Sequence, residues 1–167
     1  MFKAAFFLAL GMAQLGLPEA VLAAPVPAAA SFDTLKRLVG TWRRVDKPAS
    51  PLRIRFYLTA GDTVLVEEWL RAGQPHSLTL YHRDGDTVIA THYCPQGNQP
   101  RLASITANDA TTLNFKFRDA TDLDLKTEAY QVALSFDMSF DDRVVRSETY
   151  RLAGKDDTSK IELARDR

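Results

Sequence analysis

The chain has 167 residues, of which 46% are hydrophobic and 25% are charged, a composition typical of one globular domain and not of a disordered or fibrous protein. Its 21 Lys and Arg residues balance its 21 Asp and Glu residues, so no net field would draw it to nucleic acid or to an anionic membrane. The single cysteine, Cys94, excludes an intrachain disulfide and a multi-cysteine zinc site.

Residues 1–23 have the layout of a secretory signal peptide. Lys3 precedes a charge-free stretch from Ala4 to Pro18 that is short for a membrane span, and Val21-x-Ala23 fits the small-residue rule for cleavage. We therefore expect cleavage after Ala23, a periplasmic or secreted protein, and no stable membrane insertion after cleavage. The alternative is an uncleaved membrane anchor. Residues 24–31 are small and Pro-containing, which predicts a flexible linker before a domain spanning residues 32–167.

The spacing of apolar residues predicts one short helix over residues 32–39, which Gly40 would end. After Gly40 the spacing changes to alternation, which predicts short strands separated by turn residues. The expected strands cover residues 41–45, 52–58, 64–70, 77–82, 87–94, 101–106, 113–117, 131–140, 144–152 and 161–165. Such strands hide their edges best by closing, so we expect an all-β, antiparallel up-and-down barrel of eight to ten strands, with a two-sheet sandwich as the alternative. A barrel of this size leaves an interior able to hold one small ligand.

Leu35 to Trp42 (LKRLVGTW) resembles the opening of the calycin superfamily, which contains the lipocalins and the fatty-acid-binding-protein-like barrels. In that superfamily a short helix leads into a Gly-x-Trp on the first strand, which matches Gly40 and Trp42 here. The Trp closes one end of the barrel beneath a basic residue of the last strand. The resemblance implies that Arg165 holds this structural position, with its guanidinium over the indole.

A longer segment, residues 81–101, is similar to a group of bacterial lipocalin-like proteins. They carry a similar Asp-Gly-Asp hairpin, a Thr-His-Tyr-Cys run and a Gly-Asn-Gln-Pro-Arg run, which stand here at residues 84–86, 91–94 and 97–101. This resemblance implies a lipocalin-like barrel and draws attention to the segment, but it implies no reaction. The present chain has Tyr130 and Gln131 where those proteins often have histidines.

The hairpin around Asp84 and Gly85 determines which side chains share the surface of the candidate site. If these two residues form the turn, His82 faces Thr87 and Ser77 faces His92. One surface of the hairpin then mixes polar groups with small apolar side chains, which suits a ligand cavity, so we expect it to face inward. Its members are Ser77, Thr79, Tyr81, Val88, Ala90, His92 and Cys94.

His92 is the main candidate for a functional role, because an imidazole can bind a metal, transfer protons or donate to a ligand carboxylate. A packing role is equally open. Cys94 lies two residues on, a spacing that permits a Cys/His nucleophile pair, although a buried inert thiol fits as well. Asn98, Gln99 and Arg101 would hold a carboxylate or phosphate at the barrel mouth, unless the two amides bond to their own loop.

Two other expected strands carry charged and aromatic residues on one face. Glu67 and Trp69 share a face of the strand at 64–70, and Arg146, Glu148 and Tyr150 share one of the strand at 144–152. If these faces point inward, their charges must be paired, because an isolated buried charge is costly. The pair expected is Glu148 with Arg101 or with Arg146.

The function expected from these observations is a barrel that binds a small, largely apolar or amphipathic molecule in its interior, with no nucleic-acid partner. The candidate ligand-binding residues are Tyr81, His92, Cys94, Asn98, Gln99, Arg101, Trp69 and Tyr150, above a cavity lined by Phe56, Phe115, Phe136 and Met138.

Three alternatives remain open. One is a haem-binding barrel similar to the nitrobindins, with His92 as the axial ligand. Another is a calycin-fold enzyme that uses His92 as general base or Cys94 as nucleophile. The third is an interaction module with a solid core and an exposed apolar patch. The sequence carries no catalytic signature and no clustered metal-ligand spacing, so it assigns no catalytic residue, no metal and no cofactor beyond the haem alternative.

Overall fold

The computed structural model describes residues 27–105 and 111–166. The expected signal peptide and residues 24–26 of the expected linker lie outside this part of the chain. Within it, no helix is both long enough and apolar enough to cross a membrane.

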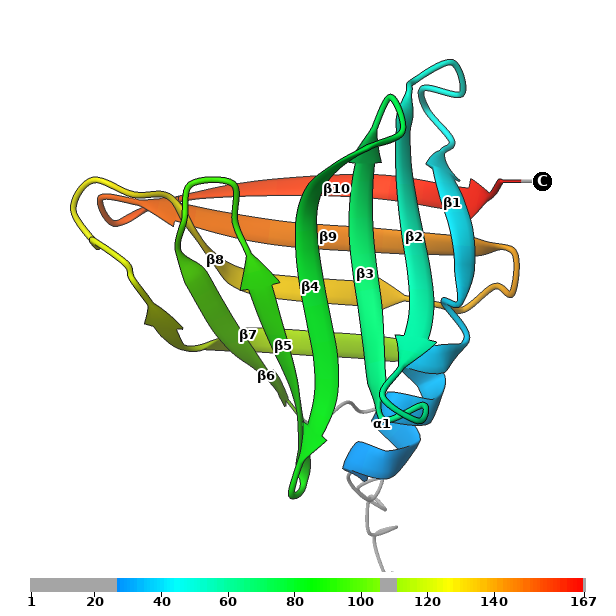
Figure 1. The fold of residues 1–167 in the computed structure, drawn as a ribbon, viewed down its shortest axis with the longest axis horizontal. Coiled ribbons are helices and arrows are strands. Elements are labelled where there is room, and N and C mark those ends of the chain that lie inside the picture. Colours follow the sequence, from blue (N-terminus) through cyan, green and yellow to red (C-terminus); the bar gives the residue numbers. More distant parts are fainter. Residues whose placement is uncertain (1–26, 106–110, 167) are drawn as a thin grey trace, which may run out of the picture.

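Ten antiparallel strands form one closed barrel, in which each strand pairs with its neighbours along the chain and β1 pairs with β10 (Figure 1). The strands are β1 (Gly40–Arg44), β2 (Leu52–Thr59), β3 (Val64–Arg71), β4 (Gln74–Asp84), β5 (Thr87–Tyr93), β6 (Gln99–Ile105), β7 (Thr112–Thr121), β8 (Tyr130–Asp137), β9 (Arg143–Leu152) and β10 (Lys155–Arg165). In Figure 1, β2 to β5 lie in front and β7 to β10 cross behind them. The closed barrel confirms the expected all-β up-and-down fold and excludes the sandwich.

The helix α1 (Ala28–Lys36) lies at one end of the barrel and packs against β4 and β5 (Figure 1). It begins four residues before the expected start at Phe32. The helix starts early because three alanines, which favour helix, follow the extended Pro27. Ala28 is buried in the core, so residues 28–31 belong to the folded domain and the expected linker is wrong for them.

Gly40, Trp42 and Arg165 close the barrel near α1. The Arg165 guanidinium lies 4.5 Å from the centroid of the Trp42 ring and donates to the carbonyl oxygens of Val39 and Arg37, both at 2.9 Å. Gly40 has φ of 130°, and a Cβ at this position would lie 2.9 Å from Nη1 of Arg165, so glycine is required here. These contacts bring the three residues together at this end of the barrel.

The interior near α1 is filled by aromatic side chains. Phe136 packs edge to face against Phe56 and Tyr81, with ring centroids 6.3 and 6.1 Å apart, and Tyr81 packs in the same way against Phe115 at 5.8 Å. All four rings and Met138 are buried in one core cluster. The expected ligand cavity lined by Phe56, Phe115, Phe136 and Met138 is therefore wrong, because these side chains pack against one another.

Candidate functional site

The hairpin of β4 and β5 turns at Gly85 and Asp86, one residue later than expected. Asp84 pairs with Thr87, and Thr79, not Ser77, pairs with His92. The reason is that Gly85 takes the first loop position, where its φ of 57° suits glycine.

The expected register is therefore off by two residues, which leaves every side chain on its expected face. Thr79, Tyr81, Val88, Ala90 and His92 are all buried, so this surface faces inward as predicted.

Glu67 on β3 is the centre of a buried polar network that begins where the aromatic core ends. Its side chain is completely buried. Trp69 donates its indole N–H to one carboxylate oxygen at 2.6 Å, and Tyr81 donates its hydroxyl to the other. The Nε of Arg146 lies 2.9 Å from the first oxygen. Donors on both oxygens are what an ionised carboxylate requires when it is removed from water.

Arg146 on β9 joins this carboxylate to a second one. Its Nη1 donates to Glu148 at 2.7 Å, and its guanidinium lies 4.9 Å from the centroid of the Trp69 ring. Burial disfavours its charge, but the carboxylates of Glu67 and Glu148 outweigh burial, so the pKa of Arg146 is raised. The expected pairing of Glu148 with Arg146 is confirmed, and the pairing with Glu67 across the barrel was not foreseen.

Glu148 lies at the outer edge of this network. Burial alone would raise the pKa of its carboxyl, but the charge and hydrogen bond of Arg146 outweigh burial and hold it below its usual value. Glu148 therefore carries a negative charge at neutral pH. Besides Arg146, it accepts from Gln131 at 3.3 Å and from Ser159 at 3.4 Å.

His92 on β5 is held through both ring nitrogens. Nδ1 lies 2.9 Å from the hydroxyl of Thr79, and Nε2 lies 3.1 Å from the hydroxyl of Tyr150 on β9. Burial raises the pKa of Tyr150, and the nearby Glu148 charge adds to the effect, so this phenol stays protonated. His92 is thus held in a fixed position, and because burial and the Arg146 charge lower its pKa to about 4, it is uncharged at neutral pH.

A pocket of about 150 Å³ opens beside these residues. The strand ends that carry several of its walls, the C-terminal end of β3 and the N-terminal end of β4, lie away from α1 (Figure 1). Its walls are Trp69, Arg71, His76, Ser77, His92, Pro95, Glu148 and Tyr150. The volume is below the range of about 300–1,000 Å³ that is usual for drug-sized ligands, so the pocket suits one small group of a ligand.

Arg71, His76 and Pro95 were not foreseen as members of this pocket. Trp69 pairs with Ser77 while Leu70 pairs with Pro75, so His76 is the extra residue of a β-bulge. A bulge redirects side chains, and here two consecutive residues, His76 and Ser77, both line the pocket. Pro75 is the one sequence signal for it, since proline within a strand marks an edge or a bulge.

The other candidate binding residues do not line this pocket. Tyr81 is buried beneath it and bonds to Glu67, while Arg101 is exposed and pairs with Asp119 at 2.5 Å. Asn98 donates to Glu128 and to the Ala129 carbonyl, at 3.3 and 3.2 Å.

Two more of the candidates lie at the ends of the loop between β5 and β6, where Cys94 follows β5 and Gln99 begins β6. Gln99 donates to the Gly97 carbonyl oxygen within its own turn. Cys94 is a half-buried free thiol, and its backbone N–H donates to the carbonyl of Asn98. Gln99 thus bonds to its own turn, as the simpler alternative had it, whereas Asn98 bonds to the residues that precede β8.

The geometry does not suit haem, because both nitrogens of His92 already have partners and an axial bond would require Tyr150 to leave. A Cys/His pair likewise requires a free nitrogen, and among the described residues no hydrogen bond joins Cys94 to His92. Nor does any group of three or more His, Cys, Asp or Glu side chains in that part of the chain form a candidate metal site.

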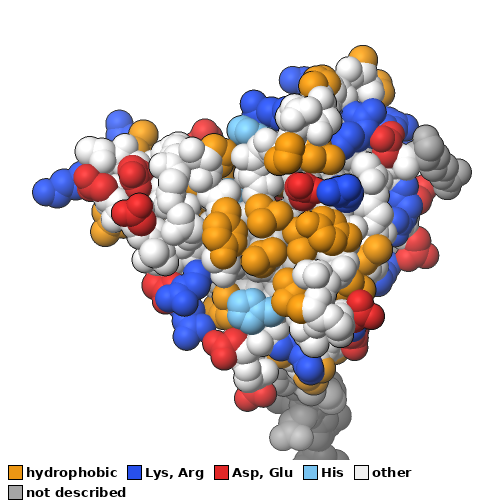
Figure 2. All heavy atoms as spheres, viewed as in Figure 1, with side chains coloured by type: hydrophobic (Ala, Val, Ile, Leu, Met, Phe, Trp, Pro, Cys, Tyr) orange, Lys and Arg blue, Asp and Glu red, His pale blue; other side chains and the backbone are white. Residues whose placement is uncertain are grey.

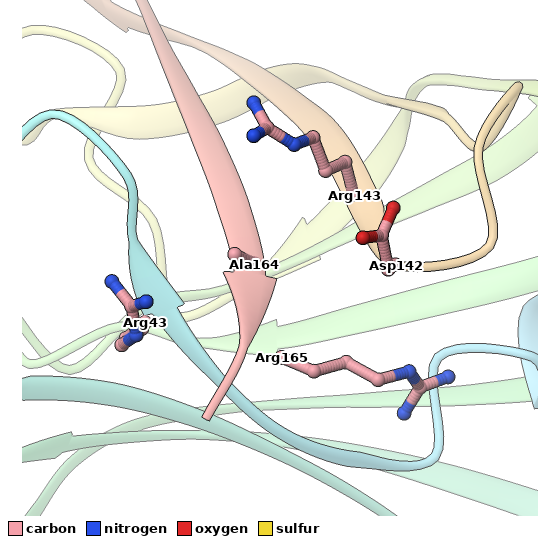
Figure 3. A pocket seen from close by; sticks show the side chains of 5 residues that line it. All are labelled: Arg43, Asp142, Arg143, Ala164 and Arg165. Atoms are coloured by element: carbon pink, nitrogen blue, oxygen red, sulfur yellow. The ribbon is translucent and has the colours of Figure 1, made fainter. Parts of the chain in front are cut away.

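A different pocket, of about 350 Å³, lies beside β1, β9 and β10 and is lined by Arg43, Asp142, Arg143, Ala164 and Arg165 (Figure 3). The three guanidinium groups point in different directions in this view. Arg143 is paired with Glu162 at 2.7 Å, and Arg165 bonds to backbone carbonyls. These arginines therefore do not converge on one anion.

The outer face over β2 to β5 gathers apolar side chains (Figure 2). Tyr57 and Tyr93 are exposed in this part of the barrel, and Leu78 and Leu80 are partly exposed. An exposed apolar patch is the observation expected for the interaction-module alternative. Nothing in the described residues shows what would cover it.

One prediction concerns the buried imidazole. Burial, with a smaller contribution from the Arg146 charge, lowers the pKa of His92 from 6.5 to about 4. The folded state therefore favours neutral His92, and the resulting stability is complete above about pH 6.5 and lost as the pH falls towards 4. We expect this residue to lower the free energy of unfolding by about 3 kcal/mol between pH 7 and pH 4.

Urea unfolding at both pH values measures this effect. His92→Gln should lose most of the pH dependence that the residue causes, while His82→Gln, on the outward face of β4, should keep it. Equal pH dependence in the wild type and His92→Gln would contradict the prediction.

No family model matches the chain, and a search of the curated proteins found no match.

Proposed function

We propose that the protein is an exported binding barrel that holds a small molecule by a polar group placed in the pocket beside His92, Glu148 and Tyr150. The observation that carries this proposal is the pocket itself, since it opens directly onto a buried polar network. A cleft with a few fixed polar groups is the usual form of a small-molecule site.

The polar groups are held in place by second contacts. His92 is fixed by Thr79 and Tyr150, and Glu148 is fixed by Arg146 and Gln131. Preorganised groups lose little entropy when a ligand binds, which favours binding in a small pocket. Trp69 and Pro95 give the same pocket its apolar surface, so an amphipathic ligand fits it better than the largely apolar one first expected.

A substitution that fills the pocket with a larger side chain tests the proposal. Fragment-sized molecules would be screened by ligand-observed NMR against the wild type, Ser77→Phe and Thr91→Phe. Ser77 lines the pocket, whereas Thr91 lies on the outward face of the neighbouring strand. We expect fragments that bind the wild type and Thr91→Phe but not Ser77→Phe. If no fragment binds, or if Ser77→Phe binds as well as the wild type, the proposal is wrong.

A further inference from the structure

The buried network holds more negative than positive charge. Glu67 and Glu148 share one guanidinium, that of Arg146, whose side chain is 1% exposed. With His92 neutral and Tyr150 protonated, no other member of this network supplies a positive charge. One negative charge is therefore uncompensated within the buried network, and burial makes such a charge costly.

The excess charge is accessible from the pocket through Glu148. Its carboxylate lines the pocket, and within residues 27–105 and 111–166 one of its oxygens has only the long 3.4 Å contact with Ser159. The other oxygen accepts from Arg146 and Gln131. The first oxygen thus has capacity for a further donor, and a charged donor would supply the missing positive charge as well.

The remaining walls suit a cation with a short apolar part. Trp69 and Tyr150 present aromatic rings to the pocket, and aromatic rings attract cations. Arg71 and His76 are the basic side chains at the mouth, but both are exposed, so solvent screens their charges more than it screens Glu148.

We infer that the group bound in this pocket is an ammonium, so that the ligand is a small amine whose N–H donates to Glu148. This inference rests on the proposed function, because it names the class of ligand for the same pocket. Binding of the amine leaves the network with equal numbers of positive and negative charges.

Three probes with one carbon skeleton test the ligand class: n-butylamine, n-butanol and butyrate, each titrated into the protein at pH 7 and followed by NMR. Butylamine should bind at least about tenfold more tightly than butanol, the difference between a charge-assisted and a neutral hydrogen bond. Butyrate should bind most weakly, since Glu148 repels it.

Two matched substitutions test whether Glu148 causes the preference for the amine. Glu148→Gln should abolish the preference for the amine, while Glu162→Gln, which neutralises an exposed glutamate on the outer surface, should keep it. A preference for amine that survives Glu148→Gln would overturn the inference.

The ranking of the probes in the wild type tests the inference even if Glu148→Gln does not fold. If butanol or butyrate binds as tightly as the amine, and Ser77→Phe blocks it, the ammonium inference fails while the proposed function stands. If no probe binds, the ammonium inference fails, and the fragment screen alone decides whether the proposed function stands.

Discussion

Arg146→Met is expected to lower the free energy of unfolding by about 3–5 kcal/mol, the usual cost of removing one partner from a buried ion pair. The reason is that Glu67 is completely buried and has no other cationic partner among the described residues. Trp69 and Tyr81 would remain as its donors, but neutral donors do not replace a neighbouring positive charge. Urea unfolding at pH 7 measures the loss through the midpoint, with the slope as a check on two-state behaviour.

Arg143→Met is the matched control, because Arg143 lies on the same strand but pairs with Glu162 in solvent. The substitution should lower the free energy of unfolding by less than about 1 kcal/mol. The double variant Glu67→Gln/Arg146→Met should recover part of the loss of the single variant, since it removes both charges. An Arg146→Met protein as stable as Arg143→Met would contradict the account of the network.

Phe136→Ala is expected to cost about 3–5 kcal/mol, as for other buried phenylalanines. Phe136 contacts Phe56 and Tyr81 in the aromatic core, and its ring centroid lies 5.8 Å from the Arg146 guanidinium. Its removal would leave a cavity between the two halves of the interior. If the interior near α1 were instead a ligand cavity, the loss would be small, because few contacts would be broken.

Phe140→Ala provides the comparison, since Phe140 is 68% exposed and follows the same strand. It should change the free energy of unfolding by no more than about 0.5 kcal/mol. Equal losses for the two alanine variants would mean that the barrel interior is not packed in this region. Thermal unfolding of both variants gives the same ranking independently of denaturant.

The barrel could be predicted from the sequence because its signals are local. Alternation along each strand and Gly or Asp at the turns predicted all ten strands within a few residues, except that β4, β7 and β10 are longer. Alternation also placed His92 and Tyr81 on the inward face, and this survived an error of two residues in the register, because side chains alternate with a period of two.

Contacts across the barrel could not be predicted in the same way. Glu67 and Arg146 lie on β3 and β9, which are not neighbours in the sheet, so no pairing rule joins them. The filling of the interior depends on how Phe56, Phe115 and Phe136 pack together, and their sequence positions do not fix this. The bulge at His76 changes the direction of one strand, and only Pro75 signals it.

We expect a small cationic molecule to bind at the barrel end that Trp69 and Glu148 line. The most direct test of this binding uses the two tryptophans, whose indole N–H groups give separate signals in a ¹H–¹⁵N NMR spectrum. Trp69 lines the pocket and donates to Glu67, whereas Trp42 does not line it and donates to the Leu38 carbonyl. Titration with n-butylamine should shift the Trp69 indole signal to saturation and leave that of Trp42 in place. A Trp69 signal that does not move, or one that moves no more than that of Trp42, would contradict the account.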